Sequence, residues 1–130
     1  ADTAVLITKI IYIKKTKNKD FIILDTGMND LIRPALYGTN HKIIPVIKKS
    51  IKSKKTYEFV GPICESTDTF LTTNNFQKLK EKDLIIISKV GAYGMSLSSN
   101  YNVRPKPIEI LIKGSKINII KKRQKLTDLI

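Results

Sequence analysis

Short apolar runs, several of them alternating with polar residues, are the main pattern of this chain, and they predict β-strands. The expected strands cover residues 3–13, 20–26, 41–48, 56–63, 82–90 and the two arms of a hairpin over 107–122. The run at 82–90 is almost uninterrupted, which predicts a strand buried on both faces. Pro45 cannot donate to a sheet, so its strand is expected at an edge or a bulge. About seven short strands joined by turns favour an all-β fold, a Greek-key-like barrel or sandwich.

Helical signals are weak and short. Residues 28–37 could begin a helical turn after Asn29, but Pro34 is expected to interrupt it. One or two turns are expected over residues 74–80, and a small terminal helix over 125–130. We therefore expect a β fold with only a few short helical turns.

The length and the cysteine count predict a single domain without an internal disulfide. The chain has 130 residues and a single cysteine, so it is long enough to form one core and cannot form an internal disulfide. A lone thiol is typical of a reducing compartment, and we expect a cytoplasmic protein. Residues 1–13 lack the basic start and cleavage site of a signal peptide, and the apolar runs are too short to cross a bilayer. One soluble domain, residues 1–130, with no membrane partner is therefore expected.

The charge is strongly basic, with 24 Lys and Arg against 11 Asp and Glu and a net charge of +13. Such a balance is compatible with nucleic-acid binding. The lysines, however, are spread over predicted turns and strand ends, where they are commonly solvated. A barrel that binds single strands would also need aromatic side chains on a strand face beside the lysines. Nucleic acid is therefore not the expected partner, and a basic nucleic-acid-binding β-barrel is kept as an alternative.

Three stretches break the strand pattern and are the candidates for chemistry. DTGMNDLIRPALYG (25–38) and VGAYGMSLSSNYNVRP (90–105) crowd Gly, Pro, Tyr, Arg and Asn between strands, and GPICESTDTF (61–70) places Cys64 beside Glu65. Loops of this kind carry function when a rigid scaffold positions them. The residue pattern by itself leaves two interpretations of Cys64 open, because a lone cysteine after an apolar strand is often buried filler.

In this order, the three stretches resemble the C-terminal β domain of the diaminopimelate decarboxylases, pyridoxal-phosphate enzymes of the alanine-racemase-like fold (fold type III). The resemblance extends over essentially all 130 residues. It implies a domain for substrate recognition and dimerisation in an enzyme that converts meso-2,6-diaminopimelate to L-lysine and CO2, the last step of lysine biosynthesis. It also implies that an N-terminal β/α barrel, which carries the Schiff-base lysine and most of the phosphate cradle, is absent from this chain. The isolated chain is therefore expected to be inactive.

The resemblance assigns roles to five residues. Cys64 is the implied catalytic acid that returns a proton after CO2 departs, and Glu65 the implied ligand of the substrate's distal amino group. Both would reach into the partner subunit's site in a homodimer. Arg33 and Tyr37 would bind the distal carboxylate, for which a guanidinium is suited because it forms two parallel hydrogen bonds. Tyr93 would contact both the cofactor phosphate and the substrate.

The remaining candidates receive structural roles. Asp68 is expected to order the loop after Cys64, and residues 98–105 to support the site and pack the dimer, without chemistry of their own. His41 is the only histidine, so no metal site is expected. Two further functions stay open: a related decarboxylase for ornithine, arginine or a carboxylated polyamine, and a chain that serves only to dimerise.

Overall fold

A computed structural model describes residues 2–130, and its elements follow the apolar runs closely. The strands are β1 (Val5–Lys15), β2 (Lys19–Leu24), β3 (Ile43–Pro45), β4 (Thr56–Val60), β5 (Thr69–Thr73), β6 (Leu84–Ser88), β7 (Glu109–Lys113) and β8 (Lys116–Lys121). Three short helices are α1 (Arg33–Tyr37), η1 (Tyr101–Val103) and η2 (Leu126–Leu129). The all-β prediction is confirmed, as are both hairpins and the terminal helical turn. None of the helices in the described part is long and apolar enough to span a membrane.

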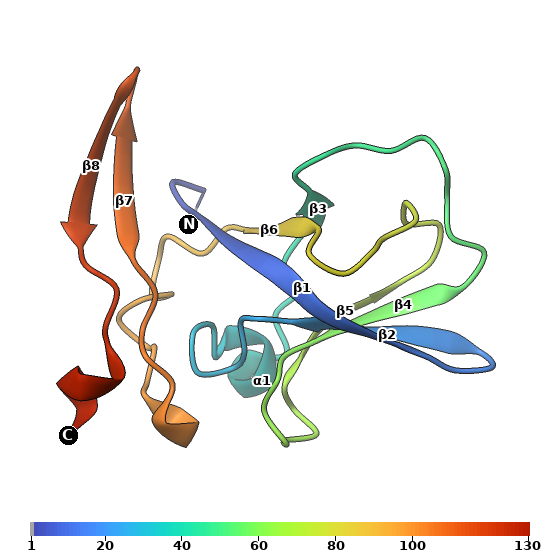
Figure 1. Cartoon of the computed structure of the whole chain (residues 1–130), viewed down its shortest axis with the longest axis horizontal. Coiled ribbons are helices and arrows are strands. Elements are labelled where there is room, and N and C mark those ends of the chain that lie inside the picture. The colour runs from blue at the N-terminus through green and yellow to red at the C-terminus, as the bar shows by residue number, and fades with distance from the viewer. Residues whose placement is uncertain (1) are drawn as a thin grey trace.

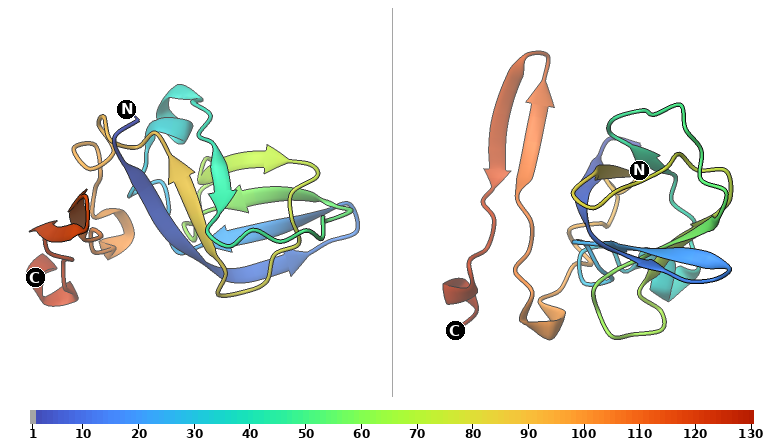
Figure 2. Two further views of the ribbon diagram at one scale, coloured as in Figure 1. Left: turned by 90° about the horizontal axis from the view of Figure 1, so that it is seen from above. Right: turned by 45° about the vertical axis from the view of Figure 1, so that its right-hand side comes forward.

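Six strands form one sheet in the order β3-β6-β1-β2-β4-β5, antiparallel except where β2 pairs with β4. The sheet curls into a half-barrel (Figures 1 and 2). Because β3 is an edge strand, Pro45 lies at an edge, as predicted. The hairpin of β7 and β8 pairs only with itself and projects beside the sheet (Figure 1).

The core lies on the inner face of the curled sheet. In β1, Thr8 and Ile10 point inward. The register with β2 shifts between Ile10 and Tyr12, and this irregularity lets Ile13 turn inward again. The fully buried apolar side chains of the sheet are Ile10, Ile22, Leu24, Phe59, Ile85 and Ile87. Each contributes roughly 1.5–3 kcal/mol relative to an exposed position, so the sheet provides a stable scaffold for its loops.

Two predictions are wrong, one about the burial of β6 and one about a helix over residues 74–80. The strand is not buried on both faces: Ile85 and Ile87 are inside, whereas Leu84 is 44% exposed, because the sheet covers a core on one side only. Residues 74–80 form no helix, since Gln77 instead pairs with Lys52 in an isolated bridge.

Two further differences concern the loops. Pro34 does not interrupt a helix but lies in the first turn of α1, where its missing N–H is not needed. The strand β5 was not predicted, and its second residue, Phe70, packs into the core. Both elements flank the candidate site.

The topology gathers the three unusual stretches at one end of the sheet. The strands β2, β4 and β6 all run in one direction, because β4 is parallel to β2 and both β2 and β6 are antiparallel to β1. The loops that follow them therefore leave the sheet at the same end. We name them the first loop (residues 25–38), the second loop (61–68) and the third loop (89–104).

Candidate functional site

Asp68 joins the first and second loops. Its side chain is 2% exposed. One carboxylate oxygen accepts the backbone N–H of Met28 at 2.7 Å, and the other accepts that of Ile63 at 2.8 Å. Gly61 leaves the room that this arrangement needs, since a Cβ there would lie 2.2 Å from Asp68 Oδ2. Burial raises the pKa of Asp68, and the two hydrogen bonds oppose that rise. These contacts agree with the predicted structural role.

Asp30 organises the turn of the first loop. Its Oδ2 accepts hydrogen bonds from the Thr26 hydroxyl at 2.9 Å and from the Gly27 N–H at 3.2 Å. Burial raises the pKa of Asp30, while these two hydrogen bonds and the charge of Arg104 act in the opposite direction. The turn leads directly into α1, which carries two of the candidate residues.

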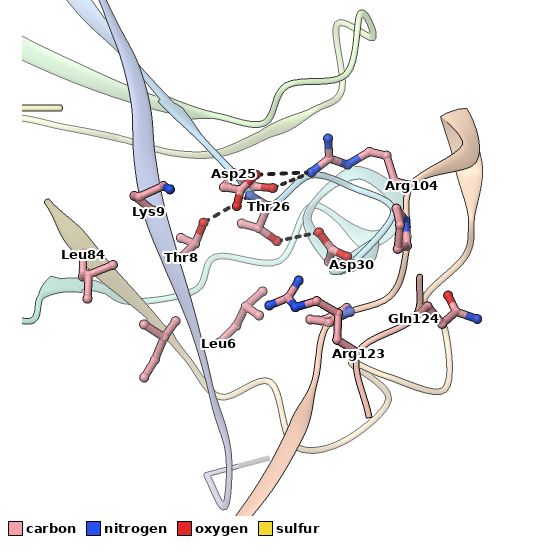
Figure 3. Close-up of a pocket in the computed structure, with 13 residues that line it drawn as sticks. Leu6, Thr8, Lys9, Asp25, Thr26, Asp30, Leu84, Arg104, Arg123 and Gln124 are labelled. Carbon is pink, nitrogen blue, oxygen red and sulfur yellow. Dashed lines mark hydrogen bonds and ion pairs between the residues drawn. The ribbon is translucent and has the colours of Figure 1, made fainter. Parts of the chain in front are cut away.

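Arg104 and Ser99 attach the third loop to the first. Arg104 Nη2 donates to the backbone carbonyl of Asp25 at 2.5 Å and lies 3.7 Å from its carboxylate, as Figure 3 shows. The Ser99 N–H donates to the carbonyl of Asn29 at 2.8 Å. Asp25 and Arg104 line a cavity of about 500 Å³, to which Arg123 of the C-terminal segment also contributes. None of the five residues with predicted roles lines this cavity.

Arg33, Tyr37 and Tyr93 form one group on the first and third loops. The Arg33 guanidinium carbon lies 5.5 Å from the ring centroid of Tyr37 and 5.9 Å from that of Tyr93, so the cation is within cation–π distance of both rings. The two tyrosines are 60% and 63% exposed. Within residues 2–130 the guanidinium makes no ion pair, so its paired N–H groups are free for a carboxylate.

Tyr93 projects from a tight turn. Its φ of 65° is in the left-handed region, which is uncommon for a residue with a side chain. The turn is close because a Cβ on Gly94 would lie 2.3 Å from the carbonyl oxygen of Val90. The Tyr93 hydroxyl has no hydrogen bond to any other part of residues 2–130. An exposed phenol with a free donor fits an oxygen of a phosphate group.

Cys64, Glu65 and Tyr101 form a second group, on the second and third loops. Cys64 is a free, exposed thiol, which excludes the interpretation as buried filler. Glu65 Oε1 accepts a hydrogen bond from the Tyr101 hydroxyl at 2.5 Å. Tyr101 was not among the predicted site residues, because it lies in residues 98–105, for which no chemistry was expected. No signal in the sequence marks it, because the contact joins residues 36 positions apart.

The two groups are separate in the described chain. No hydrogen bond, ion pair or cation–ring contact between them occurs within residues 2–130. The same residues contain no cluster of three or more His, Cys, Asp or Glu side chains that could hold a metal ion. His41 is used inside the fold, where its Nδ1 lies 2.9 Å from the carbonyl oxygen of Ser88.

Known proteins are similar to this chain in both sequence and fold. Residues 2–91 match the family model of the pyridoxal-dependent decarboxylases, C-terminal sheet domain. The chain is 43% identical over 129 residues to the diaminopimelate decarboxylase of Helicobacter pylori, a match that covers 99% of this chain and 32% of that protein.

Solved structures give the same result. The crystal structure of the H. pylori diaminopimelate decarboxylase complexed with L-lysine matches with a TM-score of 0.84 at 46% identity, over 96% of this chain and 30% of that one. The crystal structure of the M. jannaschii diaminopimelate decarboxylase matches with a TM-score of 0.89 at 35% identity, over 98% and 29%. The chain thus spans about a third of the length of the relatives it matches.

Proposed function

The chain belongs to the pyridoxal-dependent decarboxylases, as their C-terminal sheet domain, and we propose that it is the substrate-recognition domain of a diaminopimelate decarboxylase. The complete enzyme would convert meso-2,6-diaminopimelate to L-lysine and CO2. The observation that carries this proposal is the half-buried Arg33 guanidinium, which lies near the rings of Tyr37 and Tyr93 and makes no ion pair within residues 2–130.

The distal end of diaminopimelate carries a carboxylate and an ammonium group, and the two groups of side chains offer a partner for each. Arg33 suits the carboxylate, and such a charge-assisted contact contributes about 1.5–3 kcal/mol. Tyr37 adds a hydroxyl beside it. Glu65 suits the ammonium. Ornithine and arginine have no distal carboxylate, so a decarboxylase for either would leave Arg33 without its partner. This difference favours diaminopimelate over the related substrates.

Pyridoxal phosphate, when bound, supplies the electron sink that lets the carbon–carbon bond to CO2 break. The Tyr93 hydroxyl fits a contact with its phosphate. We assign the remaining cofactor contacts to the part of the decarboxylase that lies outside this chain. Cys64 would hold a proton on its sulfur and deliver it to the substrate carbon that CO2 has left, the work of a general acid.

We further propose that the two groups serve different active sites of a homodimer. Each subunit would supply Arg33, Tyr37 and Tyr93 to its own site, and Cys64 and Glu65 to the site of its partner. Two features support this arrangement: no hydrogen bond, ion pair or cation–ring contact joins the two groups within residues 2–130, and Cys64 and Glu65 are exposed.

Complementation between two inactive variants tests the proposal. Arg33→Ala and Cys64→Ala are made in the complete decarboxylase polypeptide, and each is expected to lower activity on diaminopimelate by at least about tenfold. When the two are co-expressed, half of the dimers are mixed and each mixed dimer holds one intact site, so about a quarter of the wild-type activity should return.

The matched control co-expresses Arg33→Ala with the double variant Arg33→Ala/Cys64→Ala, which never forms an intact site. If co-expression of the two single variants restores nothing beyond this control, both residues belong to one subunit's site and the proposed arrangement is wrong. If Arg33→Ala alone leaves diaminopimelate turnover unchanged, the substrate assignment itself is wrong.

A further inference from the structure

We propose that Tyr101 is a positioning residue that holds the Glu65 carboxylate in place for the distal ammonium group of the substrate. This inference rests on the proposed function. Its basis is the hydrogen bond that the Tyr101 hydroxyl donates to Glu65 Oε1 at 2.5 Å, which links the second loop to the third.

Glu65 needs such a partner because its own loop fixes only its backbone. The Glu65 N–H donates to the carbonyl of Ile63 at 2.8 Å, and its carbonyl accepts the N–H of Asp68 at 3.1 Å. These bonds leave the exposed, flexible side chain free to rotate. No lysine or arginine within residues 2–130 forms an ion pair with it. Tyr101 is therefore the group that selects one orientation of the carboxylate.

Tyr101 is itself held by a constrained loop. Its N–H donates to the Ser99 hydroxyl at 3.3 Å, and its carbonyl accepts the N–H of Arg104 at 3.3 Å. The next two residues, Asn102 and Val103, have φ values of 55° and 56°, in the left-handed region that a β-branched side chain rarely adopts. Unfavourable backbone of this kind is concentrated at functional positions. The loop thus maintains a costly conformation directly after the residue that contacts Glu65.

A tyrosine suits this task because it orients the carboxylate without neutralising it. An ionised carboxylate accepts hydrogen bonds on both oxygens, so a donor on Oε1 leaves Oε2 open for an ammonium group. A phenol is protonated at neutral pH and can therefore donate. The hydrogen bond to the Glu65 carboxylate, together with its negative charge, raises the pKa of Tyr101 further from its ordinary value. A lysine or arginine at this position would instead compete with the substrate for the negative charge.

The test is a double-mutant cycle in the complete decarboxylase with diaminopimelate as the substrate. Tyr101→Phe removes the hydroxyl and keeps the ring, and it should raise KM about three- to tenfold while kcat changes by less than about twofold. In a Glu65→Gln background, which itself raises KM, the same substitution should change KM by less than about twofold, because Tyr101 acts through the Glu65 carboxylate. Tyr12→Phe, an exposed tyrosine on β1, is the matched control and should leave KM unchanged.

Two results would overturn the inference while leaving the proposed function intact: a Tyr101→Phe variant with the wild-type KM, or an equal rise of KM in both backgrounds. A different result would remove the Glu65 assignment and the inference together, namely a Glu65→Gln variant that binds diaminopimelate as well as the wild type. Equal melting temperatures of the wild type and the Tyr101→Phe variant verify that the fold is retained.

Discussion

Replacing Asp68 by alanine should loosen the end of the sheet that carries the candidate site. The substitution leaves the backbone N–H groups of Met28 and Ile63 without their acceptors in a buried place. Each unsatisfied donor costs about 1–3 kcal/mol. Burial disfavours the charged carboxylate and raises the pKa of Asp68, and alanine removes this desolvation cost. We therefore expect a net loss of about 2–4 kcal/mol in the free energy of unfolding.

Urea unfolding followed by circular dichroism measures this loss, which is a large part of the roughly 5–15 kcal/mol of a typical domain. Hydrogen exchange at the amides of Met28 and Ile63 provides the local measurement, and both should exchange faster in the variant. Asp68→Asn should lose about half as much, since the amide keeps one oxygen acceptor. Asp2→Ala is the matched control: this carboxylate is 81% exposed and should matter by less than about 0.5 kcal/mol.

The reasoning is refuted if Asp68→Ala unfolds within about 0.5 kcal/mol of the wild type and both amides keep their protection. Such a result would mean that the first and second loops hold their shape without the carboxylate. The attachment of the second loop to the first would then need another explanation.

Two other predictions concern pH and the cofactor. Burial would raise the pKa of Asp83, but the hydrogen bonds from the Lys49 ammonium at 2.5 Å and the Lys80 N–H at 3.0 Å, with the charges of both lysines, outweigh it and lower that pKa below 3.8. The resulting stability is present above pH 3.8 and is lost as the pH falls through the folded-state pKa. Asp83→Asn should therefore lower the free energy of unfolding by about 0.5–1 kcal/mol at pH 7 and by progressively less in acid. A loss that stays constant down to pH 2 contradicts this prediction. The isolated chain should not retain pyridoxal phosphate through gel filtration, because we place the lysine that binds it outside these residues; a lasting absorbance from one specific lysine of the chain contradicts that placement.

The sequence predicted most of the sheet because strand patterns are local. Alternating or continuous apolar runs located β1, β2, β4 and the β7–β8 hairpin, and the proline rule located β3 at an edge. The burial of β6 was predicted incorrectly, since a continuous apolar run does not reveal that the second face of the sheet lacks a covering layer. The effect of Pro34 was predicted incorrectly, because a proline breaks a helix from an interior position but is accommodated in the first turn, where Pro34 lies.

The candidate site was predicted only in part. The sequence placed Arg33 and Tyr37 together, since they lie four positions apart. Their contact with Tyr93, and that of Glu65 with Tyr101, depend on how three distant loops meet at one end of the sheet. No local pattern contains that information, because it follows from the parallel pairing of β2 with β4 and from the long third loop.

The most direct test of the central claim is the reaction of the complete polypeptide that carries this chain. The native gene product is purified, supplied with pyridoxal phosphate and incubated with meso-2,6-diaminopimelate, and released CO2 and L-lysine are quantified. The account predicts equal amounts of CO2 and L-lysine from diaminopimelate, and no release of CO2 from ornithine or arginine. Faster CO2 release from ornithine or arginine, or none from diaminopimelate, would contradict the role that we give to Arg33 and with it the proposed function.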